Sequence, residues 1–146
     1  MADPDEPLDH DRAISALNDA LRVQYRSSLA YSLVAGSLTG FAHVALGPQL
    51  YAYASAELDD ARRLVEKIVA LGAESTTRVA DLQFHAKADD AFAWLLEAEH
   101  EAIDAVAAVI QAGGGDAESE ALEHRLEHII MRKQEQVEAL ERARRG

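Results

Sequence analysis

The stretch AELDDARRLVEKIVALG, residues 56–72, decides the fold of this chain. Its apolar residues recur at steps of three and four, the spacing that places side chains along one stripe of an α-helix. Glu57 falls within that stripe, and Asp60 or Ala61 is its next member, so two carboxylates stand where leucine would be expected in a helix that packs against others. The stretch is therefore predicted to form a long core helix that carries two carboxylates on its buried face.

Three further segments have the same design, at about residues 10–38, 88–112 and 117–141. Each has an amphipathic pattern of helical period, interrupted by polar residues near the middle of its apolar stripe. These mid-stripe polar residues are Gln24, Glu99, and the pair Lys133 and Gln136. Helices of roughly 25 residues are about 38 Å long, so the four segments can pack side by side. The pattern predicts an all-α, up-down four-helix bundle.

Proline and glycine residues mark the ends of these helices. Pro48 suits the first turn of the second helix, where a missing N–H costs nothing, and Gly72 suits its carboxyl end. Residues 113–115 are three consecutive glycines that stop the third helix. The segment from Gly72 to about Lys87 has weak periodicity and is long enough to cross the bundle between the second and third helices.

The ends of the chain frame a single domain. Residues 1–9 are acidic and are predicted to be a disordered lead, and residues 10–144 to form one bundle domain. Asp9 or Asp11 is the expected N-cap of the first helix. Asp116 or Ser119 is the expected cap of the fourth.

Composition narrows the function. The 146 residues are 49% apolar, enough for one core, and the net charge of −12 argues against binding to nucleic acid. The absence of cysteine excludes disulfides and thiolate metal sites, leaving oxygen and imidazole ligands for any metal. No window approaches an uninterrupted apolar span of about 18 residues, and the N-terminus has no apolar signal segment. We expect a soluble, cytoplasmic protein with no membrane partner.

Two segments carry a family resemblance. LNDALRVQYRSSLAYSLVAG, residues 17–36, and AELDDARRLVEKIVALGAESTT, residues 56–77, resemble the first two helices of ferritin-like proteins, closest to the bacterioferritin branch. The resemblance runs from about Ile14 to Glu141, and the long connection before the third helix agrees with it. It implies a ferritin-like fold with a di-iron centre between the four helices.

The resemblance also implies which residues occupy the metal positions. The family's centre takes one Glu from each of the first and third helices and a Glu-x-x-His pair from each of the second and fourth. Carried onto this chain, those positions fall in order on Gln24, Glu57, Asp60, Glu99, Lys133 and Gln136. The fourth-helix placement assumes one extra residue in the glycine-rich turn; otherwise the pair falls on Arg132 and Glu135. Only two of the six positions keep the family's residue, so the di-iron site is predicted to be degenerate.

Two interpretations of this rewritten site follow. In the favoured one no metal is bound, and the Lys133 ammonium supplies the positive charge that buried carboxylates require, in a structural or binding protein rather than an enzyme. In the other, Glu57, Asp60, Glu99 and Gln24 hold a single iron or manganese ion, and Lys133 swings outward. The resemblance then implies a ferroxidase-like or other metal-dependent oxidoreductase, or an iron-handling protein. A pocket for a small ligand in the bundle core is a third possibility.

The remaining candidate residues are interpreted as follows. Tyr31 lies two turns beyond Gln24 and is expected to pack beside the site, together with Gln136. No haem is expected, because Leu58 stands where the bacterioferritin-like pattern has a methionine ligand. A His pair spaced four apart, at positions 124 and 128, could chelate zinc but has charged neighbours typical of a solvated flank.

Assembly is expected to stop at a homodimer. The chain has no fifth helix of the kind that many cage-forming relatives carry, and ferritin-like subunits commonly pair through their first two helices. An apolar patch for such pairing could come from Tyr25, Leu29, Tyr51 and Leu58.

Overall fold

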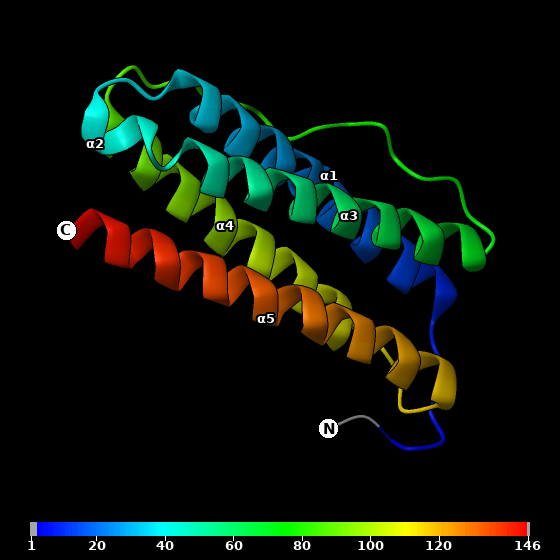
Figure 1. The fold of residues 1–146 in the computed structure, drawn as a ribbon. Coiled ribbons are helices and arrows are strands. Elements are labelled where there is room, and N and C mark those ends of the chain that lie inside the picture. The colour runs from blue at the N-terminus through cyan, green and yellow to red at the C-terminus, as the bar shows by residue number, and fades with distance from the viewer. Residues whose placement is uncertain (1–2, 146) are drawn as a thin grey trace.

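Four long helices and one short helix make up the fold in a computed structural model that describes residues 3–145 (Figure 1). Residues 1 and 2, part of the expected lead, lie outside the described residues. The helices are α1 (His10–Ser37), α2 (Phe41–Val44), α3 (Gly47–Ala70), α4 (Ala88–Gln111) and α5 (Ala117–Arg145). The described residues contain no strand. The predicted all-α four-helix bundle is confirmed, with α2 as an unexpected single turn of helix between α1 and α3.

The chain direction follows from the long crossover. Residues 71–87 run back along the length of the bundle, so α4 points the same way as α3, whereas α1 and α5 point the opposite way (Figure 1). Two contacts hold the crossover on α1: the Thr76 N–H donates to the Asn18 side chain at 2.8 Å, and the Ala80 N–H donates to the Arg22 carbonyl at 3.1 Å. The crossover is therefore attached to α1.

Local sequence signals set the helix ends. The Asp9 side chain caps α1 by accepting from the Arg12 N–H at 3.2 Å. Pro48 lies in the first turn of α3, and Gly72 follows α3 with φ of 83°, a left-handed conformation that favours glycine. The Asp116 side chain accepts from the Ser119 N–H at 2.9 Å in the first turn of α5. These hydrogen bonds identify Asp9, rather than Asp11, and Asp116, rather than Ser119, as the N-caps of α1 and α5.

The acidic lead has a defined position over residues 3–9 in this structure. The Glu6 carbonyl accepts from the N–H groups of Gly115 and Asp116, at 2.9 and 3.1 Å, and the Leu8 side chain is buried. A side chain at Gly115 would collide with the backbone of Asp3. The predicted disorder of the lead stays a prediction, and the structure adds a docking place for it on the α4–α5 turn.

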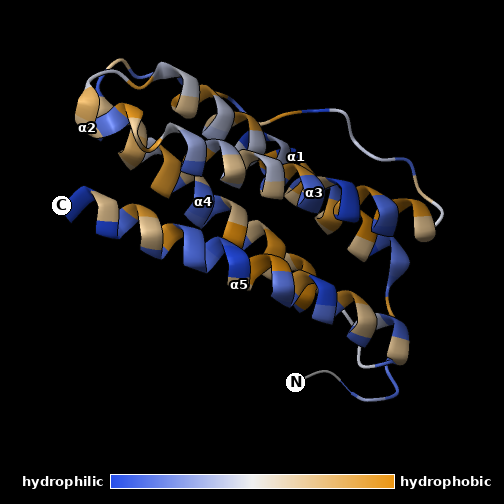
Figure 2. Ribbon diagram, in the orientation of Figure 1, coloured by the Kyte–Doolittle hydropathy of each residue, from blue (hydrophilic) through white to orange (hydrophobic). Residues whose placement is uncertain are grey.

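The apolar core has two main parts, one toward each end of the bundle. Figure 2 shows α5 with hydrophilic residues along its outer edge and hydrophobic residues toward α4. One part includes Leu17, Leu21, Leu64, Ile68, Leu126 and Ile129. The other part includes Tyr31, Leu50, Phe92, Leu95, Val137 and Leu140. Between the two, at mid-bundle, lie buried polar and charged residues, beside a small apolar cluster of Val23, Ala80 and Ala102.

Helix packing is uneven around the bundle. α1 packs closely against both α3 and α4, and α4 packs closely against α5. α3 and α5 approach each other at very few positions. This leaves the fourth side of the bundle open as a groove. No helix among the described residues is long and apolar enough to cross a membrane.

Candidate functional site

A cluster of five polar side chains lies at the centre of the bundle, with one or two contributed by each long helix. Its members, called the core cluster below, are Gln24 on α1, Glu57 on α3, Glu99 on α4, and Lys133 and Gln136 on α5. None is more than 2% exposed. They are there because each occupies the apolar stripe of its helix, as the sequence pattern predicts.

Lys133 connects its own helix, α5, to two other helices through its ammonium group. Its Nζ donates to Glu57 Oε2 at 2.6 Å and to Glu99 Oε1 at 3.1 Å. The two carboxylates come from α3 and α4, so one cation joins three helices. A completely buried ammonium is tolerable only with such charged partners.

The two glutamine side chains complete the hydrogen bonds to the carboxylates. Gln136 Nε2 donates to Glu57 Oε1 at 2.7 Å and to Glu99 Oε2 at 3.0 Å. Gln24 Nε2 donates to Glu57 Oε2 at 2.5 Å and to the Glu57 carbonyl at 2.8 Å. Every carboxylate oxygen of the core cluster thus accepts at least one hydrogen bond.

The two glutamates differ in protonation. Burial raises the pKa of Glu57, but attraction and hydrogen bonds from Lys133, with further bonds from Gln136 and Glu99, outweigh burial and hold that pKa below its usual value. Burial raises the pKa of Glu99 to about 7; Lys133 opposes this rise, whereas the Glu57 charge adds to it. The core cluster therefore contains one firmly ionised carboxylate beside the ammonium and a second carboxyl group that titrates near neutral pH.

Tyr31 borders the core cluster, as the sequence analysis expects. Its hydroxyl lies 3.5 Å from Gln136 Nε2, and its ring meets that of Tyr53 edge-on, with 5.6 Å between ring centroids. Burial, followed by the nearby charges of Glu99 and Glu57, raises the pKa of Tyr31. The phenol is held neutral, and its ring contributes to the apolar packing beside the cluster.

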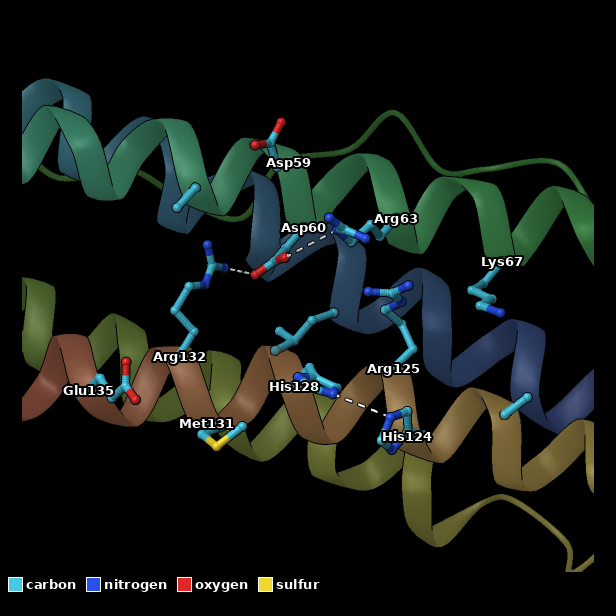
Figure 3. Close-up of a pocket in the computed structure, with 13 residues that line it drawn as sticks. Asp59, Asp60, Arg63, Lys67, His124, Arg125, His128, Met131, Arg132 and Glu135 are labelled. Atoms are coloured by element: carbon cyan, nitrogen blue, oxygen red, sulfur yellow. Dashed lines mark hydrogen bonds and ion pairs between the residues drawn. The ribbon is translucent and has the colours of Figure 1, made fainter.

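Asp60 does not join the core cluster. Its carboxylate forms an ion pair with Arg132 of α5, and Arg63 Nε lies 4.0 Å from Asp60 Oδ1 (Figure 3). The inner position on this turn of α3 belongs to Ala61, which is 1% exposed. The sequence pattern had left both residues open as stripe members. The alternative mononuclear site of Glu57, Asp60, Glu99 and Gln24 would therefore require Asp60 to leave its arginine partners.

The register of α5 follows the extra-residue alternative. Lys133 and Gln136 face the bundle centre, whereas Arg132 and Glu135 line the groove between α3 and α5. The arginine that the other register would place in the metal site instead pairs with Asp60. In the turn before α5, Gly113 donates its N–H to the Ile110 carbonyl at 3.0 Å.

A di-iron centre does not fit these donors. Two metal ions about 3.5–4 Å apart need several anionic ligands, four carboxylates and two imidazoles in the ferritin-like pattern. At the bundle centre this chain offers two carboxylates, and the Lys133 ammonium already lies against both. Within residues 3–145, no group of three His, Asp or Glu side chains is arranged to hold a metal ion.

The charged lining of the groove was not predicted from the sequence. Arg63 and Lys67 on α3, spaced four apart, face Arg125 and Arg132 on α5, spaced seven apart. Both spacings put each pair on one helical face, which was the available signal. On the far side of the bundle, Arg26 is buried and pairs with Glu101 at 2.6 Å, another contact that the pattern did not single out.

Comparisons with known proteins agree with this fold. The ferritin-like domain model matches residues 14–144, nearly the whole chain. The chain therefore belongs to the ferritin-like domain family. Its assignment to the bacterioferritin branch stays a prediction.

One solved structure gives the comparison in three dimensions. It is a crystal structure of ferritin-like, diiron-carboxylate proteins from Bacillus anthracis str. Ames, with a TM-score of 0.84 and 24% sequence identity. The match covers 92% of this chain and 96% of that one. At this identity the likeness establishes the fold alone. No curated protein sequence matches this chain.

Proposed function

We propose that this protein is a ferritin-like bundle that works without a metal, as a structural or binding protein, with the Lys133 ammonium in place of the metal charge. The observation that carries the proposal is the position of Lys133 Nζ, 2.6 Å from Glu57 and 3.1 Å from Glu99 in a fully buried site. In the ferritin-like pattern the fourth helix supplies a carboxylate here.

Charge balance supports the proposal. With Glu99 protonated, Glu57 and Lys133 neutralise each other; with Glu99 ionised, the core cluster carries a single negative charge. A divalent ion entering beside Lys133 would meet a fixed positive charge and compete for carboxylate oxygens that already accept hydrogen bonds. The ammonium thus supports the fold and also opposes metal binding.

Metal analysis tests the proposal directly. The protein is incubated anaerobically with Fe(II), Mn(II) or Zn(II), desalted and analysed for metal, beside a Glu57→Ala/Glu99→Ala control. We expect only trace metal, the same in both proteins. Stoichiometric metal that the control loses would overturn the proposal and make oxygen consumption the next assay.

A second candidate function, a metal-dependent oxidoreductase or iron-handling protein, rests on one observation. The side-chain oxygens of Gln24 and Gln136 are buried and have no hydrogen-bond partner, and such oxygens can ligate a hard cation. For a mononuclear site Lys133 must leave the centre and Asp60 must leave its arginines. The variant Lys133→Ala separates the two functions: stoichiometric Mn(II) in this variant but not in the parent would mean that lysine alone prevents metal binding.

We also propose that the protein is a homodimer that pairs through α1 and α3. Four large apolar side chains are exposed on these helices: Leu29, Tyr51 and Leu58 of the predicted patch, at 45%, 61% and 56%, and Val69 at 60%. Tyr25, the remaining member of the predicted patch, is partly buried against the core. We expect these exposed residues to form an apolar patch, and such patches are typical of interaction surfaces. Light scattering of the parent and of Leu58→Lys tests this: a dimer is expected for the parent and a monomer for the variant. A monomeric parent would contradict the proposal.

A further inference from the structure

The open side of the bundle contains a cavity. It lies between α3 and α5, has a volume of about 520 Å³, and is lined by charged and imidazole side chains from both helices (Figure 3). That volume is in the range of pockets that hold small molecules. The cavity is separate from the core cluster, because none of the five core-cluster residues lines it.

Basic side chains gather at one end of this cavity. Arg63 and Lys67 reach into it from α3, and Arg125 reaches into it from α5 (Figure 3). All three are partly buried, so their charges are less screened than on an open surface. With Arg132, four of the chain's 14 basic residues line this one cavity, in a protein whose net charge is −12.

Two of these positive charges, those of Lys67 and Arg125, are not neutralised by neighbouring carboxylates. Within residues 3–145, neither Lys67 nor Arg125 has a carboxylate within 4.0 Å. Asp60 is engaged by Arg132, with Arg63 at the 4.0 Å limit. The other acidic lining residues, Asp59 and Glu135, lie toward the opposite end, away from Lys67 and Arg125 (Figure 3).

A second, adjoining cavity points to the same basic residues. It has a volume of about 270 Å³ and shares Arg63, Lys67 and Arg125 with the first. Its acidic lining residue, Glu66, is paired with Arg62 at 3.2 Å. The three shared cations therefore form a common wall between two spaces, with no carboxylate within a 4.0 Å ion-pair distance of Lys67 or Arg125.

The rest of the lining suits a small polar ligand. His124 and His128 stand beside Arg125 on α5, with 3.3 Å between their Nε2 atoms, so one ring donates to the other. Ile129 and Ala121 supply an apolar base. Imidazole N–H groups and guanidinium forks are both donors suited to oxyanions.

We propose that the groove between α3 and α5 is a binding site for a small polyanion, one that carries at least two phosphate or carboxylate groups. Arg63 and Arg125 approach it from opposite helices and provide planar donor pairs, and Lys67 adds a point charge. A ligand with two anionic groups can contact both helices at once, on the side of the bundle where the α3 and α5 backbones approach each other at very few positions.

Calorimetric titration of the intact protein with pyrophosphate, and separately with citrate, tests the site. The test variant is Lys67→Ala/Arg125→Ala. The control, Arg12→Ala/Arg22→Ala, removes the same charge from two exposed arginines of α1 that line neither cavity. Circular dichroism confirms that both variants are folded.

We expect the parent and the control to bind at least one probe with equal affinity, and the test variant to bind it at least about tenfold more weakly. Pyrophosphate alone would identify phosphate groups as the recognised chemistry, and citrate alone would identify carboxylates. Absence of heat with both probes would overturn the proposal. An equal loss in the control, which indicates attraction by net charge, would also overturn it.

Discussion

The core cluster and the groove between α3 and α5 contain similar side chains in opposite circumstances. In the core cluster every charge is buried and has a partner, with Lys133 against Glu57 and Glu99. In the groove the charges are partly exposed, and Lys67 and Arg125 have no carboxylate within 4.0 Å among the described residues. The two regions are only one helix face apart on α3 and α5.

The difference follows from what water can do at each place. An ammonium without partners at the bundle centre would cost several kcal/mol, so its partners are part of the fold. In the groove, water solvates Lys67 and Arg125, so the fold does not require partners for them. Substitution of the core-cluster lysine should therefore change stability, and substitution of the groove lysine should change ligand binding.

The same substitution at the two lysines is the strongest test of this comparison. We expect Lys133→Met to lower the free energy of unfolding by about 3–5 kcal/mol, because it leaves Glu57 buried without its cation. Lys67→Met should change it by less than about 0.5 kcal/mol. Urea denaturation in the presence of a chelator measures both.

A rescue experiment separates charge from packing. In Lys133→Met/Glu57→Gln/Glu99→Gln the uncompensated carboxylates are gone, and most of the lost stability should return. If the triple variant is as unstable as Lys133→Met, the loss comes from the shape of the side chain, and the idea that lysine replaces a metal charge is wrong.

The two glutamates of the core cluster should differ in importance at pH 7. Glu57→Gln removes the ionised partner of Lys133, and we expect a loss of about 2 kcal/mol. Glu99→Gln replaces a carboxyl group that is partly protonated at this pH, and we expect a loss of about 1 kcal/mol or less. Equal losses in denaturant unfolding would contradict the assignment of the charge to Glu57.

Much of the core cluster could be predicted from the sequence. Gln24, Glu57, Glu99 and Lys133 interrupt apolar stripes of helical period, and a residue in such a stripe faces the interior whatever its chemistry. The helix ends were also close to those predicted, because proline, glycine and aspartate act locally. Both signals depend only on neighbours along the chain.

What the sequence could not predict depends on distances between helices. Asp60 and Ala61 were equally good stripe members, and only the position of Arg132 across the groove draws Asp60 outward. The groove itself exists because α3 and α5 stand apart, and a periodic pattern does not encode that separation. The short helix α2 is too brief to show any period.

The pH dependence of stability should come partly from Glu99. Its pKa is about 7 in the folded protein and 4.5 in the unfolded chain, so between these values the folded state holds a proton that the unfolded state has lost. Stability from this group is complete below about pH 4.5 and falls as pH rises through about 7. Glu57 acts in the opposite sense at lower pH, because its pKa is lowered on folding.

Thermal unfolding from pH 5 to pH 8 for the parent and Glu99→Gln measures the Glu99 contribution. The amide cannot titrate, so the variant should lose less stability than the parent as pH rises, and the difference between them isolates Glu99 from the histidines. Parallel curves for the two proteins would mean that Glu99 does not take up a proton on folding.

The smallest expected effect is the coupling energy of an ion pair in the groove, compared with that of an ion pair in the core cluster. Asp60 and Arg132 form a pair in which the arginine side chain is 30% exposed, whereas both members of the Glu57–Lys133 pair are fully buried. Double-mutant cycles, with Asp60→Asn and Arg132→Met for one pair and Glu57→Gln and Lys133→Met for the other, give the two coupling energies. We expect less than about 1 kcal/mol for the groove pair and several times more for the core pair.

Salt sharpens this last comparison. Raising the ionic strength from about 0.1 M to about 1 M shortens the screening length from about 10 Å to about 3 Å, which weakens interactions between solvent-exposed charges. The coupling between Asp60 and Arg132 should fall, because water and ions reach the arginine. The coupling between Glu57 and Lys133 should stay constant, because no solvent reaches either group. A salt-dependent core pair would mean that the bundle centre opens to solvent, and the charge that opposes metal there would then be screened.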